Sequence, residues 1–131
     1  MLFRSAALVR CQRALELDTN AQGAESPDVA LDLACLGEAH LGLGTAAQAV
    51  TLLERARDIH ARAPGDKLDV ARASFLLGQA LWRHDPSGAR GRASRLLEEA
   101  RLGLESLGTR ARVELREVTE WRTRHAQDLL D

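Results

Sequence analysis

The sequence predicts an all-α protein, an α-α superhelix of about six antiparallel helices. Residues 28–37 (DVALDLACLG) return about 41 positions later as 69–78 (DVARASFLLG). A second matched pair follows, 49–57 (AVTLLERAR) and 93–101 (ASRLLEEAR), and its apolar residues recur at helical spacing. Aromatic residues make up only 3% of the chain, so the core must be built from Leu, Ala and Val, which suit helices. A self-similar unit of this length is typical of stacked helical hairpins.

The first helix is expected over about 2–18, because Leu8, Cys11 and Leu15 lie on one face at helical spacing. Polar residues and glycine follow, so the segment 19–25 is expected to be the longest loop. No linker that would divide the chain into two domains is apparent, and residues 1–131 are expected to form one domain.

Ser26 is expected to cap the second helix, with Pro27 at its first position. This helix runs to Leu43, and Gly44 is expected to end it in the left-handed conformation. Thr45 is expected to cap the third helix, which ends before the Pro-Gly pair at 64–65.

Asp66 is expected to begin the fourth helix, which continues through Arg83 until the broken segment 84–88. The fifth helix covers about 89–106. Thr109 is expected to cap a sixth helix, extending to about 125–127, that closes the stack at its C-terminal end. The two full units are therefore 27–61 and 66–106, followed by a capping helix at 109–127.

Small residues recur where the helices of each hairpin must approach closely. Gly37 and Gly78 occupy the same place in their helices, although an interior glycine costs roughly 1 kcal/mol relative to alanine. The partner helices carry alanine at matching positions, with Leu53 and Leu97 between the alanines. We therefore expect both glycines to face a neighbouring helix.

The spacing resembles the tetratricopeptide repeat (TPR), whose units carry a Leu-Gly pair and later an Ala-x3-large-x2-Ala run. The matching residues are Leu33, Leu36, Gly37, His40, Ala49, Leu53 and Ala56 in one unit and Ser74, Leu77, Gly78, Leu81, Ala93, Leu97 and Ala100 in the other. The family's aromatic positions hold other residues here. The helix at 2–18 resembles an isolated second helix of a preceding unit, which leaves open whether it continues a longer array, caps the stack or contacts another chain.

The period of about 42 residues resembles the kinesin-light-chain type of TPR, found in bacterial proteins. Phe75-x6-Trp82 and Val118-x2-Trp121 resemble the C-terminal end of the arrays that accompany bacterial serine/threonine kinases. The resemblance implies a protein-binding or scaffolding role in signalling. A glycine-rich loop and a catalytic Asp motif are missing from the sequence, so any kinase domain would lie elsewhere.

The resemblance also implies that the first helix of each unit lines a concave groove for a peptide or protein segment. The positions that carry over are Ala34, Glu38, Leu41 and Gly42 in the first unit and Arg72, Phe75, Gln79, Trp82 and Arg83 in the second. We favour Glu38, Leu41 and the second set as partner-binding residues, since aromatic and Arg side chains are enriched in interfaces. For Phe75 and Trp82 the alternative is a core position that packs the last helix.

Several other function classes are disfavoured. The chain has 18 basic and 19 acidic residues, without the basic excess that nucleic-acid binding requires. Neither a membrane span nor a signal peptide is apparent, so we expect a cytoplasmic protein without membrane contact. The four histidines show no metal-ligand spacing, and nucleophile and phosphate-loop motifs are missing, so no cofactor, metal or enzymatic activity is expected.

Cys11 takes the place of core Leu53 in the repeat register, so a buried free thiol is expected. A bond to Cys35 is conceivable because adjacent helices carry both residues, but a reducing compartment disfavours it.

Two functions remain. The first is a non-catalytic interaction module of TPR type that binds a peptide or protein of unknown identity in its groove. The alternative is a regulatory or oligomerising C-terminal tail of a larger signalling protein, which self-associates or docks through its first and last helices.

Overall fold

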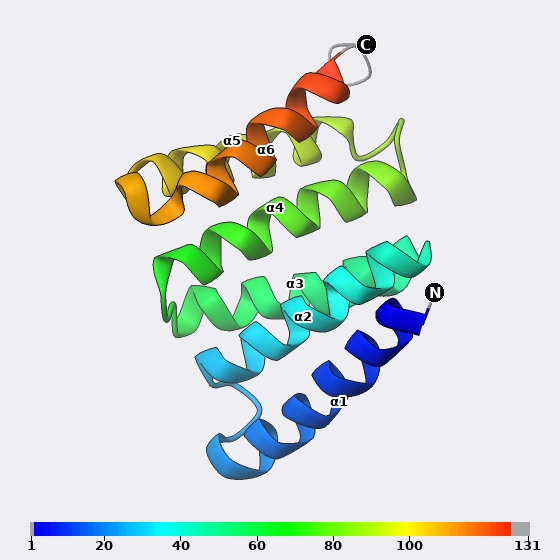
Figure 1. Ribbon diagram of the computed structural model, residues 1–131, viewed down its shortest axis with the longest axis vertical. Coiled ribbons are helices and arrows are strands. Elements are labelled where there is room, and N and C mark those ends of the chain that lie inside the picture. The colour runs from blue at the N-terminus through cyan, green and yellow to red at the C-terminus, as the bar shows by residue number, and fades with distance from the viewer. Residues whose placement is uncertain (1, 127–131) are drawn as a thin grey trace.

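The computed structural model describes residues 2–126, which are helical over most of their length and include no strand. The elements are α1 (Leu2–Gln22), α2 (Pro27–Leu43), α3 (Ala46–Arg62), α4 (Lys67–His84), α5 (Arg90–Glu105), the short 3-10 helix η1 (Gly108–Ala111) and α6 (Arg112–Arg124). Each α-helix packs on the next one in chain order (Figure 1). The predicted all-α arrangement of consecutive helices is confirmed.

The helices alternate between two layers. In Figure 1, α3 lies behind α2, and α5 lies behind α6. α2 also contacts α4 directly, although a whole helix separates them in the sequence. α1 packs on α2 at the N-terminal end of the stack. This alternation places α2, α4 and α6 where their side chains can form one shared surface.

Three of the expected helix boundaries are confirmed. The hydroxyl of Ser26 accepts a hydrogen bond from the Val29 N–H at the start of α2. The Asp66 carboxylate accepts one from the Leu68 N–H, at 2.8 Å, at the start of α4. Gly44 ends α2 with a φ of 82°, a conformation that a side chain disfavours.

The predicted loop at 19–25 is too long. α1 continues to Gln22, because the polar residues at its end remain helical until Gly23 reverses the chain with a φ of 90°. The Gly23 N–H donates to the Thr19 carbonyl at 2.9 Å, which completes the last turn of the helix.

Two predicted threonine caps are also wrong. Thr45 precedes α3 but makes no side-chain cap; its hydroxyl instead donates to the carbonyl oxygen of His40 at 3.0 Å. The last helix begins at Arg112 rather than Thr109, because Gly108 has a φ of 63° and starts the 3-10 turn. The expected end at 127 lies outside the described residues.

Both repeated glycines face a neighbouring helix, as predicted. A Cβ atom on Gly37 would lie 2.6 Å from Cγ of Leu53, and one on Gly78 would lie 3.1 Å from Cγ of Leu97. The four alanines of the repeat, Ala49, Ala56, Ala93 and Ala100, are fully buried. Small residues therefore let α2 approach α3, and α4 approach α5.

We expect substitution by alanine to affect stability differently at the two glycines. We expect Gly37→Ala to destabilise the protein by roughly 1–3 kcal/mol, because the branch point of Leu53 cannot move aside without repacking. Gly78→Ala should be near neutral, since its milder contact offsets the roughly 1 kcal/mol gain in helix propensity. Urea unfolding of both variants measures the difference. Equal destabilisation would contradict this account of the packing.

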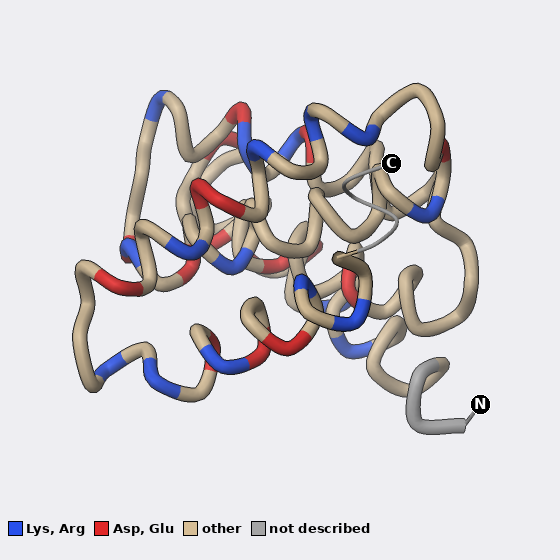
Figure 2. Tube along the Cα trace, turned by 90° about the horizontal axis from the view of Figure 1, so that it is seen from above, with Lys and Arg blue, Asp and Glu red and all other residues tan. Residues whose placement is uncertain are grey.

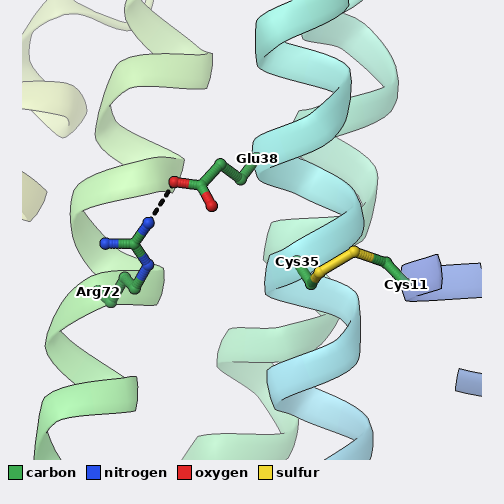
Figure 3. The surroundings of a disulfide bond; sticks show 4 residues. All are labelled: Cys11, Cys35, Glu38 and Arg72. Carbon is green, nitrogen blue, oxygen red and sulfur yellow. Dashed lines mark hydrogen bonds and ion pairs between the residues drawn. A yellow bond between two sulfur atoms is a disulfide. The ribbon is translucent and has the colours of Figure 1, made fainter. Parts of the chain in front are cut away.

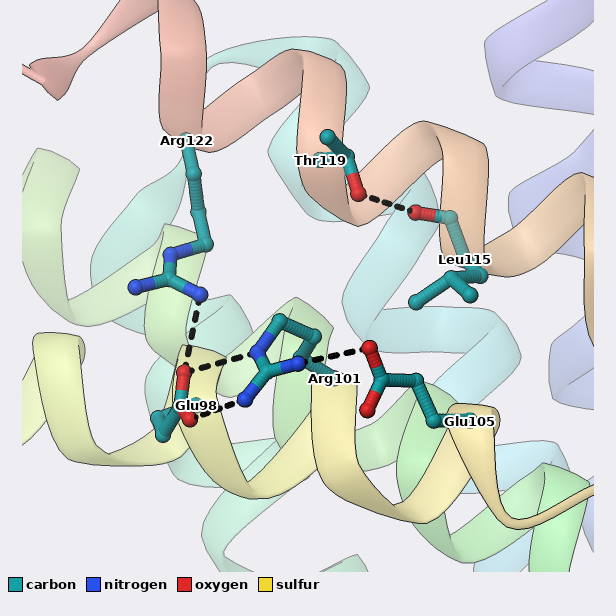
Figure 4. A network of polar contacts seen from close by, with 6 residues as sticks. All are labelled: Glu98, Arg101, Glu105, Leu115, Thr119 and Arg122. Atoms are coloured by element: carbon teal, nitrogen blue, oxygen red, sulfur yellow. Dashed lines mark hydrogen bonds and ion pairs between the residues drawn. The ribbon is translucent and has the colours of Figure 1, made fainter.

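The C-terminal helix α6 is attached to α5 by apolar packing and by a charged network (Figure 4). Glu98 of α5 accepts hydrogen bonds from Arg101 and from Arg122 of α6, the latter at 2.8 Å. The bond from Arg101, more than any other contact, lowers the pKa of Glu98 to about 2. Val118 and Trp121 of α6 are buried against this end of the stack.

Basic and acidic residues are interspersed along the described chain, and Figure 2 shows no face given over to one sign. None of the helices within residues 2–126 combines the length and the apolar character that crossing a membrane requires.

The expectation of free cysteines is wrong. Cys11 of α1 and Cys35 of α2 form a disulfide, with their Cα atoms 5.8 Å apart (Figure 3). Cys11 is buried, as predicted from its place in the repeat register, whereas Cys35 is exposed. The pairing follows from the direct packing of α1 on α2, which brings the two residues face to face.

Candidate partner-binding groove

A groove of about 600 Å³ opens between α2, α4 and α6. Its lining residues are Glu38, Leu41, Gly42, Leu43, Gly44, Arg72, Phe75, Leu76, Gln79, Arg83, Glu117, Glu120, Trp121 and Arg124. A cavity of this volume falls within the range of ligand-binding sites in proteins.

Most of the residues proposed from the sequence meet in this groove. Glu38 and Leu41 come from α2, together with Gly42. α4 contributes Arg72, Phe75, Gln79 and Arg83, whose spacings of three and four residues place them on one helical face. The regularity of α4 therefore brings residues scattered over 12 positions of sequence to one surface.

The floor of the groove is apolar. Leu41, Phe75 and Trp121 are each less than a tenth exposed and present only an edge to the groove. Phe75 packs in the same cluster as Trp121 and also lines the groove, so it is both a core residue and part of the floor.

Trp82 and Ala34 do not line the groove, which corrects their assignment. Trp82 meets Trp121 edge to face, with ring centroids 5.5 Å apart, and its ring lies 4.5 Å from that of His125. It therefore packs the last helix, which is the alternative that the sequence left open for this residue. Ala34 is buried in the cluster that includes Leu76 and cannot present a side chain to a partner.

Arg72 crosses the groove rather than pointing freely into it. Its guanidinium forms an ion pair with Glu38 of α2 (Figure 3) and lies 3.8 Å from the Glu117 carboxylate of α6. Arg72 thus connects the three helices that make up the groove. Arg83 donates a hydrogen bond from Nη1 to the Leu41 carbonyl at 3.1 Å, which holds its guanidinium group against α2.

Other polar side chains of the rim remain available. Gln79, Glu120 and Arg124 line the groove and make no hydrogen bond or ion pair within the part of the chain that the structure describes. Together they offer hydrogen-bond donors and acceptors and include one acidic and one basic side chain. The groove therefore combines a narrow apolar floor with a polar rim of mixed charge.

The contribution of α6 was not predicted from the sequence, where this helix was expected to be only a cap. Glu117, Glu120, Trp121 and Arg124 form the third wall of the groove. A signal was present, because Trp121 follows Gln79 by 42 residues, close to the spacing of about 41 residues between the first helices of the two units. α6 lacks the Leu-Gly pair of the units at 27–61 and 66–106, so this motif does not extend the repeat into α6.

Within residues 2–126, His, Cys, Asp and Glu side chains do not gather in a group of three or more suited to hold a metal ion. Comparisons of the chain with protein-family models, with curated protein sequences and with solved structures gave no match.

Proposed function

We propose that this protein is a non-catalytic interaction module of TPR type, which binds a peptide or a segment of another protein in the groove between α2, α4 and α6. One observation carries the proposal: residues chosen from the repeat register alone, six of the seven favoured ones, line a single groove. Residues at unrelated positions of a helical stack would be distributed over several faces.

The groove suits an extended segment with a large apolar side chain between polar residues. The apolar edges of Leu41 and Phe75 offer contact along the floor. Gln79, Glu120 and Arg124 can replace the water around a peptide's polar groups without first breaking bonds to other described residues. Arg72 is less suited to a partner, because engaging it would leave Glu38 unpaired.

The test begins with a displayed library of random peptides selected on the intact protein, followed by titration of a selected peptide. We expect Gln79→Ala and Arg83→Ala each to weaken binding about 5- to 10-fold, which is about 1 kcal/mol. Circular dichroism should show unchanged helicity, because Arg83 is exposed and the half-buried Gln79 makes no hydrogen bond to another described residue. Fluorescence polarisation of the labelled peptide measures the affinity.

Arg95→Ala is the matched control, since Arg95 is an exposed arginine of α5 that does not line the groove. It should leave the affinity unchanged. Selected peptides that tolerate both groove substitutions, or that respond to Arg95→Ala as strongly, would contradict the groove assignment.

A regulatory or self-associating tail of a bacterial signalling protein, such as a serine/threonine kinase, is the second candidate. It is favoured by Val9 and Leu17 of α1, which are 67% and 59% exposed at the N-terminal end of the stack. Arg13 lies between them along the helix and interrupts the apolar surface, so we rank this role below groove binding. Both roles suit a cytoplasmic protein without nucleic-acid or membrane partners.

A further inference from the structure

α1 is the most weakly packed of the long helices. Between residues 5 and 22, Cys11 is the one buried side chain, and apolar and polar residues are spread almost evenly around the helix. α2, by contrast, buries more than half of its length. A helix that buries so little apolar surface gains less from docking on its neighbour than α2 does.

The other contacts of α1 are noncovalent and lie mainly along α2, and they include one between Asp18 and Asp32. Leu15 is half-buried against the apolar cluster of Val29, Leu33 and Ile59. Gln22 donates a hydrogen bond from Nε2 to Asp28 at 2.6 Å in an exposed position. The disulfide adds a covalent connection between α1 and α2 to these contacts.

The two cysteines of this disulfide differ in exposure. Cys11 is 4% exposed, whereas Cys35 belongs to the exposed residues of α2. In Figure 3 the bond bridges the two helices, with Cys35 on the turn of α2 that precedes Glu38. An attacking thiolate needs access to one sulfur only, and Cys35 offers it.

We propose that the Cys11–Cys35 disulfide is a reversible redox site for a dithiol reductant, and that its reduction releases α1 from α2. The proposal does not depend on the groove, because neither cysteine lines it.

The exchange runs in two steps. A thiolate of the reductant attacks Sγ of Cys35 and forms a mixed disulfide, while the Cys11–Cys35 bond breaks and Cys11 leaves as a thiolate that takes a proton from water. The second thiol of the reductant then loses its proton and attacks the reductant's own sulfur in the mixed disulfide. This closes the reductant's own disulfide, and Cys35 leaves as a thiolate that takes up the proton lost by the reductant, so that two electrons and two protons have passed to the protein.

Release of α1 would uncover an apolar surface. Val29, Leu33 and Ile59 are fully buried or nearly so with Leu15 in place. Once α1 has left, the cluster loses this cover on the side where Leu15 packs. Reduction would thereby convert a closed end of the stack into an exposed apolar face.

Hydrogen exchange of the intact protein, with and without dithiothreitol, tests the proposal. We expect amides of residues 2–22 to exchange at least about tenfold faster after reduction, while those of α4 and α5 keep their protection. Reoxidation should restore the original rates. Unchanged rates in α1 would overturn the proposal. Equal acceleration in all helices would also overturn it, since the bond would then stabilise the whole fold.

The double variant Cys11→Ser, Cys35→Ser is the matched control. It should exchange like the reduced protein in the absence of dithiothreitol and should not respond to its addition. The order of attack is tested on the wild-type protein with limiting glutathione, by mapping the mixed disulfide with mass spectrometry. An adduct at Cys35 is expected, and an adduct at Cys11 would contradict the assignment of the accessible sulfur.

Discussion

Replacing Trp121 by alanine is expected to destabilise the protein by about 3–5 kcal/mol, the usual cost of removing a large aromatic side chain from a core. Trp121 is only 4% exposed and packs with Phe75 and Trp82. Its ring also stacks on that of His125, with centroids 4.0 Å apart. The side chain therefore joins α6 to α4, and the loss should be concentrated at this end of the stack.

Urea unfolding measures the loss of stability, and near-ultraviolet circular dichroism reports on the loss of the aromatic cluster. Hydrogen exchange should show a larger loss of amide protection in α6 than in α2 or α3. Val113→Ala provides the control within the same helix, because Val113 is 62% exposed and its truncation should change stability by no more than about 0.5 kcal/mol.

The Trp121→Ala substitution should also weaken the binding of peptides selected on the groove, because Trp121 forms part of the groove floor. Full stability in the Trp121→Ala variant would show that α6 is held mainly by its ion pairs, such as that of Arg122 with Glu98. Full peptide affinity would remove α6 from the binding site.

The sequence predicted the fold well because the repeat encodes packing directly. Gly37 and Gly78 are needed only where another helix comes close, and both are found there. Ser26, Gly44 and Asp66 act through local hydrogen bonds or backbone conformation, which neighbouring residues suffice to indicate.

The errors arose where a local pattern competes with a tertiary contact. Threonine is a residue type that often caps helices, yet the hydroxyl of Thr45 forms its hydrogen bonds with His40. The disulfide was disfavoured on grounds of compartment, whereas its geometry depends on how closely two helices pack. Whether Trp82 faces the groove depends on the position of α6, and the repeat register does not contain that helix.

For the groove, the repeat register indicated which face of α4 is shared but not which side chains are free. Arg72 satisfies every sequence criterion for a binding residue and is nevertheless engaged by Glu38 and Glu117. Gln79 carries a weaker signal and remains unpaired among the described residues. Such differences depend on distances between helices that are remote in sequence.

Asp32→Asn is expected to stabilise the protein by roughly 2–4 kcal/mol above pH 8 and to have little effect near pH 4. Asp32 is 8% exposed on α2, and its Oδ2 atom has no hydrogen-bond partner within residues 2–126. Burial first, and then a hydrogen bond with Asp18 of α1 and repulsion by that carboxylate and by Asp28, raise the pKa of Asp32 from 3.8 to about 7.

The direction of the effect follows from proton linkage. Because the folded-state pKa is raised, the folded protein keeps a proton that the unfolded chain releases between about pH 4 and pH 7. The contribution of Asp32 is fully present below pH 4 and is lost as the pH rises through 7. A tenfold change in proton affinity corresponds to about 1.36 kcal/mol, so the rise in the pKa of Asp32 sets an upper limit of about 4 kcal/mol.

The titration of His60 changes the free energy of unfolding with pH in the opposite direction, and the Asp32→Asn variant should reveal this dependence. Burial is the main cause that lowers the pKa of His60 below 6.5, so its contribution is lost as the pH falls below that value. In the wild-type protein the pH dependences of stability that come from Asp32 and from His60 partly cancel around pH 6. Without Asp32, stability should fall toward acid pH through the His60 window and stay level from pH 7 to 9.

Urea unfolding at pH 4.5, 6, 7 and 8.5 measures both slopes. Asp58→Asn removes an exposed carboxylate of α3 and serves as the control, with an expected change below about 0.5 kcal/mol at every pH. A constant difference between the Asp32→Asn variant and the wild type across this range would mean that Asp32 does not titrate in it. The α1–α2 interface would then hold Asp32 in a single protonation state from pH 4.5 to 8.5.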